Sequence, residues 1–448
     1  MGKPQVIDDQ EHEQVFERVA AVDVAKASGM VCVRTGCPSR PGARRSVVQE
    51  VPATMNAVAA LGAQLAAEGV QKVTLESTSD YWRIWYYVLE AAGLDVQLVS
   101  AHQAKQLPGR PKTGKLDAVW LARLTEKGLL RASFVPPAPV RALRDCTRAR
   151  THLTQDRTRA WQRLEKLLED ALIKVSSVAS KLTTLSVRDM LEALIGGERD
   201  PHKLAGLARG RMRAKHDALA GALTGIFDDH HAELTRILLD QIDFLDARIS
   251  QLTTAIEDQL AGIPAAWGLD DGGATGPGAG TGEHTLAAPA VARLDEIPGI
   301  SLELAASIIA ETGLDMTRFP TAGHLVSWAG LSPRTLQSGP RTRHAKGHGN
   351  TYLRGYLGQA ATGAAGTSTF LGERYQRIGR RRGKAKAQVA IARSILVIIW
   401  HLLASPEARF TDLGPGYYQA RTDVDRKIRN HIRQIQALGF EVALTKTA

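Results

Sequence analysis

The amino-acid sequence predicts a mixed α/β domain at the N-terminal end, a long helical region in the middle and a mainly helical C-terminal domain. Three observations lead to this prediction. Short runs rich in valine alternate with helical spacing up to residue 126, an apolar heptad repeat follows at residues 238–256, and a Gly- and Pro-rich segment then precedes residues 291–405. A chain of 448 residues is long enough for two or three domains.

The N-terminal domain, residues 15–135, is predicted from an alternation of strand and helix patterns. Each strand is a short run of β-branched and apolar residues, and each helix has apolar residues three and four positions apart. The strands are expected at residues 18–27, 30–35, 44–52, 71–76 and 95–100, and the helices at 53–68, 81–92 and 115–126. This order predicts a mixed sheet covered by helices.

Three carboxylates occupy informative places in this pattern. Asp23 lies on the first strand, Glu76 ends the fourth, and Asp117 lies in the first turn of the last helix. In a sheet of this order the first and fourth strands are neighbours and the last helix packs across them, so the three acids are expected to converge. A carboxylate on a strand of Val and Ala is costly to bury unless it is paired or binds metal, and oxygen ligands suit Mg²⁺ or Mn²⁺. The alternative is that each acid is solvated or, for Asp117, favours a helix N-terminus.

The middle region, residues 138–262, is predicted to form a coiled coil. Residues 140–175 and 217–260 have helical spacing, and apolar residues in the second segment alternate steps of four and three, which is a heptad seam. The seam consists of Leu238, Ile242, Leu245, Ile249, Leu252 and Ile256. An antiparallel arm for dimer contacts or RNA is one interpretation, and a helical hairpin packed on itself is the other. Nucleic-acid contact or a solvated face would explain the basic residues Arg144, Arg148, Arg150, Arg157, Arg159 and Arg163.

A Gly- and Pro-rich linker at residues 263–290 separates this region from a C-terminal domain at residues 291–405, and a polar tail follows at 406–448. The turn at Pro298 and Gly299 resembles half of a helix-hairpin-helix element, which either binds a phosphate through backbone N–H groups or packs against the core. The apolar run at residues 389–404 contains Arg393 and His401 and is too short to span a bilayer, so a buried helix is expected.

The stretch at residues 330–354 contains a serine, Ser338, among positive charges and no acid. A hydroxyl surrounded by guanidinium groups provides a nucleophile and donors for the charge that develops when a phosphodiester is attacked. The alternative is a mobile basic loop in which the serine has no role. The basic residues of the stretch are Arg334, Arg341, Arg343, His344, Lys346, His348 and Arg354.

Two further clusters, together with the net charge, indicate a polyanionic partner, for which nucleic acid is the best candidate. The formal charge is +11 and the pI is about 9.6. One cluster, in the loop at 105–115, includes Arg110, Lys112 and Lys115, and is either a phosphate-backbone contact or a solvated loop. The second cluster consists of Arg374, Arg377, Arg380, Arg381, Arg382, Lys384 and Lys386 and is predicted to bind phosphate backbone.

The three cysteines form neither a disulfide framework nor a metal pattern, which indicates a reducing compartment. The polar N-terminus lacks the apolar core of a signal peptide. A soluble protein of the cytoplasm is therefore expected.

The α/β arrangement is that of the ribonuclease H and Holliday-resolvase (RuvC-like) nuclease fold, and the chain resembles the DEDD transposases of the insertion-sequence "one-ten" family. The N-terminal resemblance is carried by VDVAK around Asp23, LESTSDYW around Glu76 and GRPKTGKLDAVWLARL around Asp117. The C-terminal resemblance runs from DEIPGI through WAGLSPRTLQSG to GNTYLRGYL. The family resemblance implies that Asp23, Glu76 and Asp117 bind Mg²⁺ and that Ser338 attacks DNA and becomes joined to it. It also implies a structured bridge RNA that pairs with donor and target DNA.

One position departs from the family pattern, which places a fourth acid where this chain has Gly114. Either one metal then serves, or Asp80 or another acid substitutes. The predicted function is a DNA transposase or recombinase that forms a phosphoserine link and works as a dimer or, as the family suggests, a tetramer. The alternatives are a metal-dependent nuclease or resolvase that uses water, and an inactive nucleic-acid-binding copy.

Overall fold

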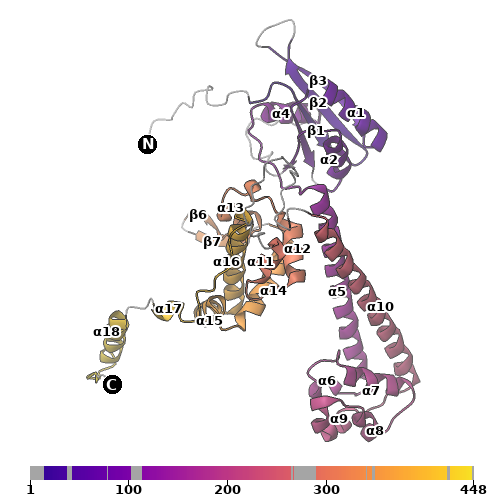
Figure 1. Cartoon of the computed structure of the whole chain (residues 1–448), viewed down its shortest axis with the longest axis vertical. Coiled ribbons are helices and arrows are strands. Elements are labelled where there is room, and N and C mark those ends of the chain that lie inside the picture. The colour runs from indigo at the N-terminus through magenta and orange to yellow at the C-terminus, as the bar shows by residue number, and fades with distance from the viewer. Residues whose placement is uncertain are drawn as a thin grey trace, which may run out of the picture. The chain divides into compact units, whose positions relative to one another are not determined.

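The computed structural model describes residues 15–37, 43–77, 79–101, 114–263, 266, 289–339, 341–345, 349–420 and 424–445. For residues 114, 115, 334–338, 341–345, 419 and 424–427 it describes the backbone without the side chain. The chain divides into two compact units, Met1–Val135 and Pro136–Ala448 (Figure 1). The first is a mixed α/β unit and the second is mainly helical, as the sequence predicts.

The first unit contains a five-stranded sheet in the order β3-β2-β1-β4-β5. The strands are β1 Val19–Val24, β2 Ser28–Gly36, β3 Arg44–Pro52, β4 Lys72–Ser77 and β5 Val96–Ser100. β1, β2 and β3 form an antiparallel meander, whereas β4 and β5 run parallel to β1. The predicted adjacency of the first and fourth strands is therefore confirmed.

Helices cover both faces of this sheet because its strands carry apolar residues on both sides. The described helices of the unit are α1 Met55–Ala67, α2 Trp82–Ala91 and α4 Gly114–Glu126. Even-numbered residues of β1, such as Ala20 and Val22, belong to the core formed with α1 and α2, whereas Val19 and Ala21 pack with Leu121 of α4. The helix that carries Asp117 thus lies across β1, as predicted.

The eight predicted elements of this unit are present, with small differences at their ends. The first strand was expected to continue to residue 27 but ends at Val24. The reason is a tight turn in which the Ala25 amide donates to the Ser28 carbonyl over 3.0 Å and the chain reverses into β2. The loop before α4, residues 102–113, lies outside the described residues, and so do Arg110 and Lys112.

Two long antiparallel helices dominate the first half of the second unit, and Figure 1 shows them side by side. They are α5 Ala138–Asp170 and α10 Asp229–Ala261. Their direction follows from two cross-contacts, Arg150 to Thr253 and Arg157 to Asp246. Four of the six seam residues are buried, and Leu238 and Leu252 are half-buried. The predicted helical pairing is present, while a supercoil stays a prediction.

Short helices between α5 and α10 form a small domain at the end of this pair, which the sequence interpretation missed. They are α6 Val175–Val178, α7 Leu185–Ile195, α8 Pro201–Gly206, the 3₁₀ helix η2 Gly210–Lys215 and α9 His216–Ala222. Met190, Leu191 and Leu194 of α7 share a core with Leu168 of α5 and Leu239 of α10. This core fixes the ends of the two long helices together.

The rest of the second unit is helical apart from one β-hairpin. Its elements are α11 Ala290–Asp295, α12 Leu302–Thr312, the 3₁₀ helix η4 Met316–Arg318, α13 Ala322–Trp328, β6 Arg334–Ser338, β7 Arg341–Ala345, α14 Thr351–Ala365, α15 Phe370–Arg382, α16 Lys384–Ala404, α17 Tyr417–Ala420 and α18 Val424–Gln436. α16 contacts α11, α13, α14 and α15 and so forms the centre of this part.

α16 is the one helix among the described residues that is long and apolar enough to cross a membrane by length and composition. Its residues Ile391, Ile395 and Ile399 are fully buried in the protein core. This is the packing of a core helix, as the sequence predicts for residues 389–404.

Candidate functional site

Two of the three predicted acids lie directly opposite each other at the carboxyl ends of neighbouring parallel strands. The register of β1 and β4 pairs Asp23 with Glu76. Both lie on the face covered by α4. Asp23 shares a face of β1 with Val19 and Ala21, which pack against α4, and Glu76 shares a face of β4 with Thr74, which contacts α4. Glu76 is buried and Asp23 is half-buried. Two carboxylates on adjacent strands are therefore brought to one edge of the sheet.

The direction of α4 brings Asp117 toward the same edge. The Val15 amide donates to the Glu126 carbonyl over 2.9 Å, so the C-terminal end of α4 lies where the chain enters β1. Thr125, two helical turns after Asp117 on α4, donates to Thr74 in the middle of β4 over 2.7 Å. Asp117, in the first turn, therefore lies toward the carboxyl ends of the strands. We refer to Asp23, Glu76 and Asp117 as the carboxylate edge.

A buried ion pair holds the other end of α4. Glu126 is 6% exposed and pairs with Arg34 of β2 and with Arg44 of β3, the latter over 3.0 Å. The adjacent thiol of Cys32 is also buried, and burial raises its pKa to about 11. Cys32 is thus a neutral core residue, while the ion pair fixes the helix whose first turn carries Asp117.

The carboxylate edge offers only oxygen donors, the type that Mg²⁺ and Mn²⁺ prefer. Within the part of the chain that the structure describes, no three His, Cys, Asp or Glu side chains are grouped closely enough to hold a metal ion. Gly114, at the start of α4 and three residues before Asp117, has no side-chain oxygen that could bind a metal ion. The side chain of Asp80 is 78% exposed and pairs with Arg83 over 3.4 Å.

The basic stretch around Ser338 forms a two-stranded β-hairpin, a structure that the sequence did not predict. β6 and β7 pair antiparallel, and Ser338 is the partner of Arg341 next to the turn. Gly339 follows Ser338 with φ of +59°, a conformation that favours glycine. We call residues 334–345 the serine hairpin; Lys346 and His348 lie outside the described residues.

The residues on either side of the serine hairpin meet at its base. A Cβ atom on Gly349 would lie 2.4 Å from the carbonyl carbon of Ala329, so the backbone after the hairpin passes directly against the backbone before it. Leu331 is buried, and its amide donates to the Val326 carbonyl over 3.0 Å. The serine is thus held on a short hairpin that projects from a closed base.

The second basic cluster lies at the junction of α15 and α16. The chain turns there at Gly383, whose φ is +85°. Arg374 and Arg377 contact Tyr418 through a 2.7 Å hydrogen bond and a 3.8 Å cation–π contact, respectively. We call the exposed residues closest to this turn the basic turn; they are Arg380, Arg381, Arg382, Lys384 and Lys386. A surface of this kind attracts phosphate groups.

A cleft of about 470 Å³ links the start of α16 to the base of the serine hairpin. It is lined by Gln388 and Val389 of α16, by Arg354 of α14 and by Leu331. Arg354, one of the predicted nucleic-acid contacts, therefore lies on a cleft wall between the basic turn and the hairpin.

Several arginines of α5 that were candidates for nucleic-acid contact pair with acids of the protein instead. Arg150 pairs with Glu303 of α12 over 2.7 Å and Arg157 pairs with Asp246 of α10. Arg144 and Arg148 both pair with Glu311. These four arginines are therefore not simply solvated, because each is paired with an acid on another helix of the same unit.

The turn at Pro298 and Gly299 also has a packing role. Gly299 has φ of +90°, and a Cβ on it would lie 2.2 Å from the Ala360 carbonyl oxygen of α14. The turn packs against α14, as expected from the second of the two interpretations of this element, a turn that packs against the core.

Two family models match the chain. A DEDD-type transposase model of the IS110 group matches residues 20–173, which include the carboxylate edge. A model described as the transposase IS116/IS110/IS902 family matches residues 291–376, which include Ser338. The insertion element IS110 uncharacterized 43.6 kDa protein of Streptomyces coelicolor is 33% identical over 114 residues. That similarity covers 25% of this chain and 28% of the relative, so it spans less than a third of the relative's length.

Proposed function

The chain belongs to the IS110 family of insertion-sequence transposases, and from this premise we propose that it cuts and rejoins DNA at element and target sites through a phosphoserine intermediate. The observation that carries the proposal is the position of Ser338, beside the turn of a basic hairpin and paired with Arg341. A serine nucleophile needs donors for the developing charge, and this hairpin supplies guanidinium groups next to it in the strand register.

In the proposed reaction, the Ser338 hydroxyl oxygen forms a bond to the phosphorus of the DNA backbone. The bond from phosphorus to the 3′ oxygen breaks, the serine proton passes to a base, and the 3′ oxygen takes up a proton as a free hydroxyl. Attack by a 3′-hydroxyl on the phosphoserine reverses these changes and joins the strands without ATP. Arg341 and Arg343 would donate to the phosphoryl oxygens during both steps.

Asp23, Glu76 and Asp117 would hold Mg²⁺ or Mn²⁺ in a RuvC-like domain. The bound ion would supply positive charge to the phosphate and lower the pKa of a coordinated oxygen. The pairing of Asp23 with Glu76 in register and the orientation of α4 support this assignment. The missing donor at Gly114 predicts weak metal binding, because hard-cation affinity rises with the number of carboxylates.

The proposed partners are donor DNA, target DNA, a structured bridge RNA and further copies of the chain. Exchange between two duplexes requires at least two protomers, and the family suggests four. Phosphate contacts are assigned to the basic turn, to Arg354 and to the loop that contains Arg110, Lys112 and Lys115. The paired helices α5 and α10, as a coiled-coil arm, are the proposed site for self-association or RNA. A cytoplasmic location in bacteria stays a prediction.

Adduct trapping tests this function. The protein is incubated with Mg²⁺, its element-derived RNA and end-labelled donor and target DNA, then denatured, and labelled DNA that migrates with the protein is measured. We expect an adduct that is lost in Ser338→Ala and retained in Thr335→Ala, a hydroxyl on the same strand.

Two other outcomes correspond to different functions. Cleaved DNA with free 5′ phosphates and no adduct indicates a water-dependent nuclease, which the carboxylate edge would serve equally well. Salt-sensitive binding without cleavage, with cleavage recovered in Gly114→Asp, indicates an inactive copy that has lost its fourth acid.

A further inference from the structure

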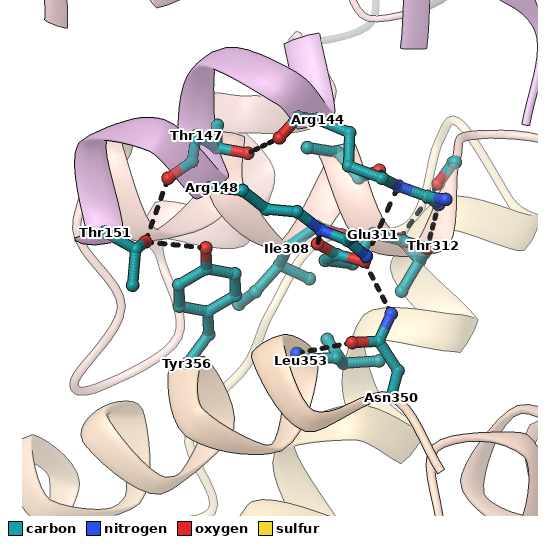
Figure 2. A network of polar contacts seen from close by, with 12 residues as sticks. Arg144, Thr147, Arg148, Thr151, Ile308, Glu311, Thr312, Asn350, Leu353 and Tyr356 are labelled. Carbon is teal, nitrogen blue, oxygen red and sulfur yellow. Dashed lines mark hydrogen bonds and ion pairs between the residues drawn. The ribbon is translucent and has the colours of Figure 1, made fainter. Parts of the chain in front are cut away.

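A buried carboxylate, Glu311, lies at the centre of a polar network that includes Arg148 and Asn350 (Figure 2). It occupies the C-terminal end of α12, and its side chain is 0% exposed. Arg148 donates to its two oxygens over 2.7 and 2.8 Å, and Arg144 donates to the backbone carbonyls of Ala310 and Glu311, each over 2.8 Å. Such a bidentate pair fixes direction as well as distance, which apolar packing does not.

Asn350 connects this carboxylate to the residues that follow the hairpin. Its side-chain oxygen accepts from the Leu353 amide over 3.1 Å and so caps α14, while its nitrogen donates to Glu311 over 2.5 Å. The preceding residue, Gly349, is the one pressed against Ala329 at the hairpin base. Glu311 therefore fixes the point from which both α14 and the end of the hairpin extend.

Further contacts hold the first turns of α14 to the same part of α5. The Thr151 and Tyr356 hydroxyl groups lie 2.8 Å apart, and His152 Nε2 lies 2.7 Å from the Tyr352 hydroxyl. The Arg148 guanidinium also stacks 4.3 Å from the centre of the Tyr352 ring. Figure 2 shows how the side chains of α5, α12 and α14 meet around Glu311.

We propose that Glu311 is a positioning residue for Ser338, acting through Asn350 on the base of the serine hairpin. This proposal rests on the proposed role of Ser338 as nucleophile. In-line attack needs the reacting atoms to be about 3–3.5 Å apart in an aligned geometry, and a displacement of about 1 Å costs on the order of a hundredfold in rate. A charged network that fixes the hairpin base in position and direction would provide this alignment.

An exchange of the two side chains tests the proposal. Asn350→Asp retains the cap on α14 but places a carboxylate against Glu311, whereas Glu311→Gln removes the buried charge. In the double variant, the introduced glutamine amide can donate to the introduced aspartate, which restores this one hydrogen bond. The amide nitrogen then replaces the oxygen that also accepts from Arg148, so the two-oxygen pair with Arg148 is lost. The quantity measured is the single-turnover rate of protein–DNA adduct formation, with DNA affinity and thermal stability measured on the same samples.

We expect each single substitution to slow adduct formation by about tenfold or more. The double variant should recover the part of the loss that comes from the contact between residues 311 and 350, since contacting residues are coupled by this magnitude. DNA affinity should change little in all three variants. Ile399→Val, a buried substitution in α16, controls for the loss of stability alone and should retain the wild-type rate.

The outcomes separate this proposal from the proposed function. The positioning role alone is overturned if the wild type forms a Ser338-dependent adduct but both single variants react at the wild-type rate, or if the two single losses simply add in the double variant. A wild type that cleaves without forming an adduct overturns the nucleophile and this inference with it.

Discussion

Substitution of Gly299 by alanine is predicted to destabilise the second unit severely. A Cβ at this position would lie 2.2 Å from the Ala360 oxygen and 2.6 Å from the Ala364 nitrogen, and both are backbone atoms that cannot rotate away. The positive φ of +90° adds about 1–2 kcal/mol for a residue with a Cβ. Overpacking in a closely packed contact adds about 1–3 kcal/mol, so a loss near 3 kcal/mol is expected.

The measurement is denaturant unfolding of the full chain, followed by far-ultraviolet circular dichroism, which reports mainly on the helical second unit. Gly355→Ala, in the second turn of α14, is the matched control. A Cβ there meets no atom within 4 Å, and alanine in a helix is expected to stabilise by about 0.5–1 kcal/mol. Unchanged stability in Gly299→Ala with weaker DNA binding would refute the packing role and favour a phosphate-binding turn.

Three further predictions concern separate parts of the molecule. Cys32 should be the slowest of the three cysteines to react with iodoacetamide, because burial raises its pKa to about 11. Mass spectrometry of the labelled peptides measures the three rates, and fast labelling of Cys32 would contradict its burial in the core. Replacing Arg381 and Arg382 with alanine should reduce the slope of log affinity for duplex DNA against log salt by about 0.9 per lost phosphate contact, and an unchanged slope would remove the basic turn from the interface. The hydrogen bond from Arg188 lowers the pKa of Asp243, so its stabilising contribution is present at neutral pH and is lost as the pH falls through the lowered pKa. Asp243→Asn should flatten this acid dependence of unfolding, and an equally steep profile would contradict the assignment.

The fold of the first unit could be predicted because each local pattern agrees with its place in the sheet. Apolar residues on both sides of a strand, as in residues 19–22, indicate a strand covered on both faces, and the strand order then places Asp23 beside Glu76. The ends of the elements were less predictable because they depend on individual turn hydrogen bonds, such as that from Ala25 to Ser28.

The serine hairpin was not predicted because its strands carry charges and no alternating apolar face. Arg334–Ser338 and Arg341–Ala345 form strands by pairing with each other around a turn that contains Gly339, and the basic composition conceals this arrangement. The chemistry assigned to Ser338 came from its neighbours in sequence, and the register then paired it with one of them, Arg341.

The network around Glu311 was missed because its partners are far apart in the chain. Arg148 and Glu311 are separated by 163 residues, and neither position shows its partner in the sequence. Two signals were present, an acid inside the apolar run that ends α12 and an asparagine directly before the helical spacing of α14. A buried acid in a mainly apolar helix indicates a paired charge, and here the pair lies beside the candidate site.

Identification of the amino acid joined to DNA tests the central claim most directly. The trapped adduct would be digested with nuclease and protease, and the peptide that carries the residual nucleotide would be sequenced by mass spectrometry. We expect a phosphodiester on Ser338 and no nucleotide-bearing peptide from the Ser338→Ala protein. A nucleotide on another residue, or DNA cut to free 5′ phosphates with no linked peptide, would contradict it.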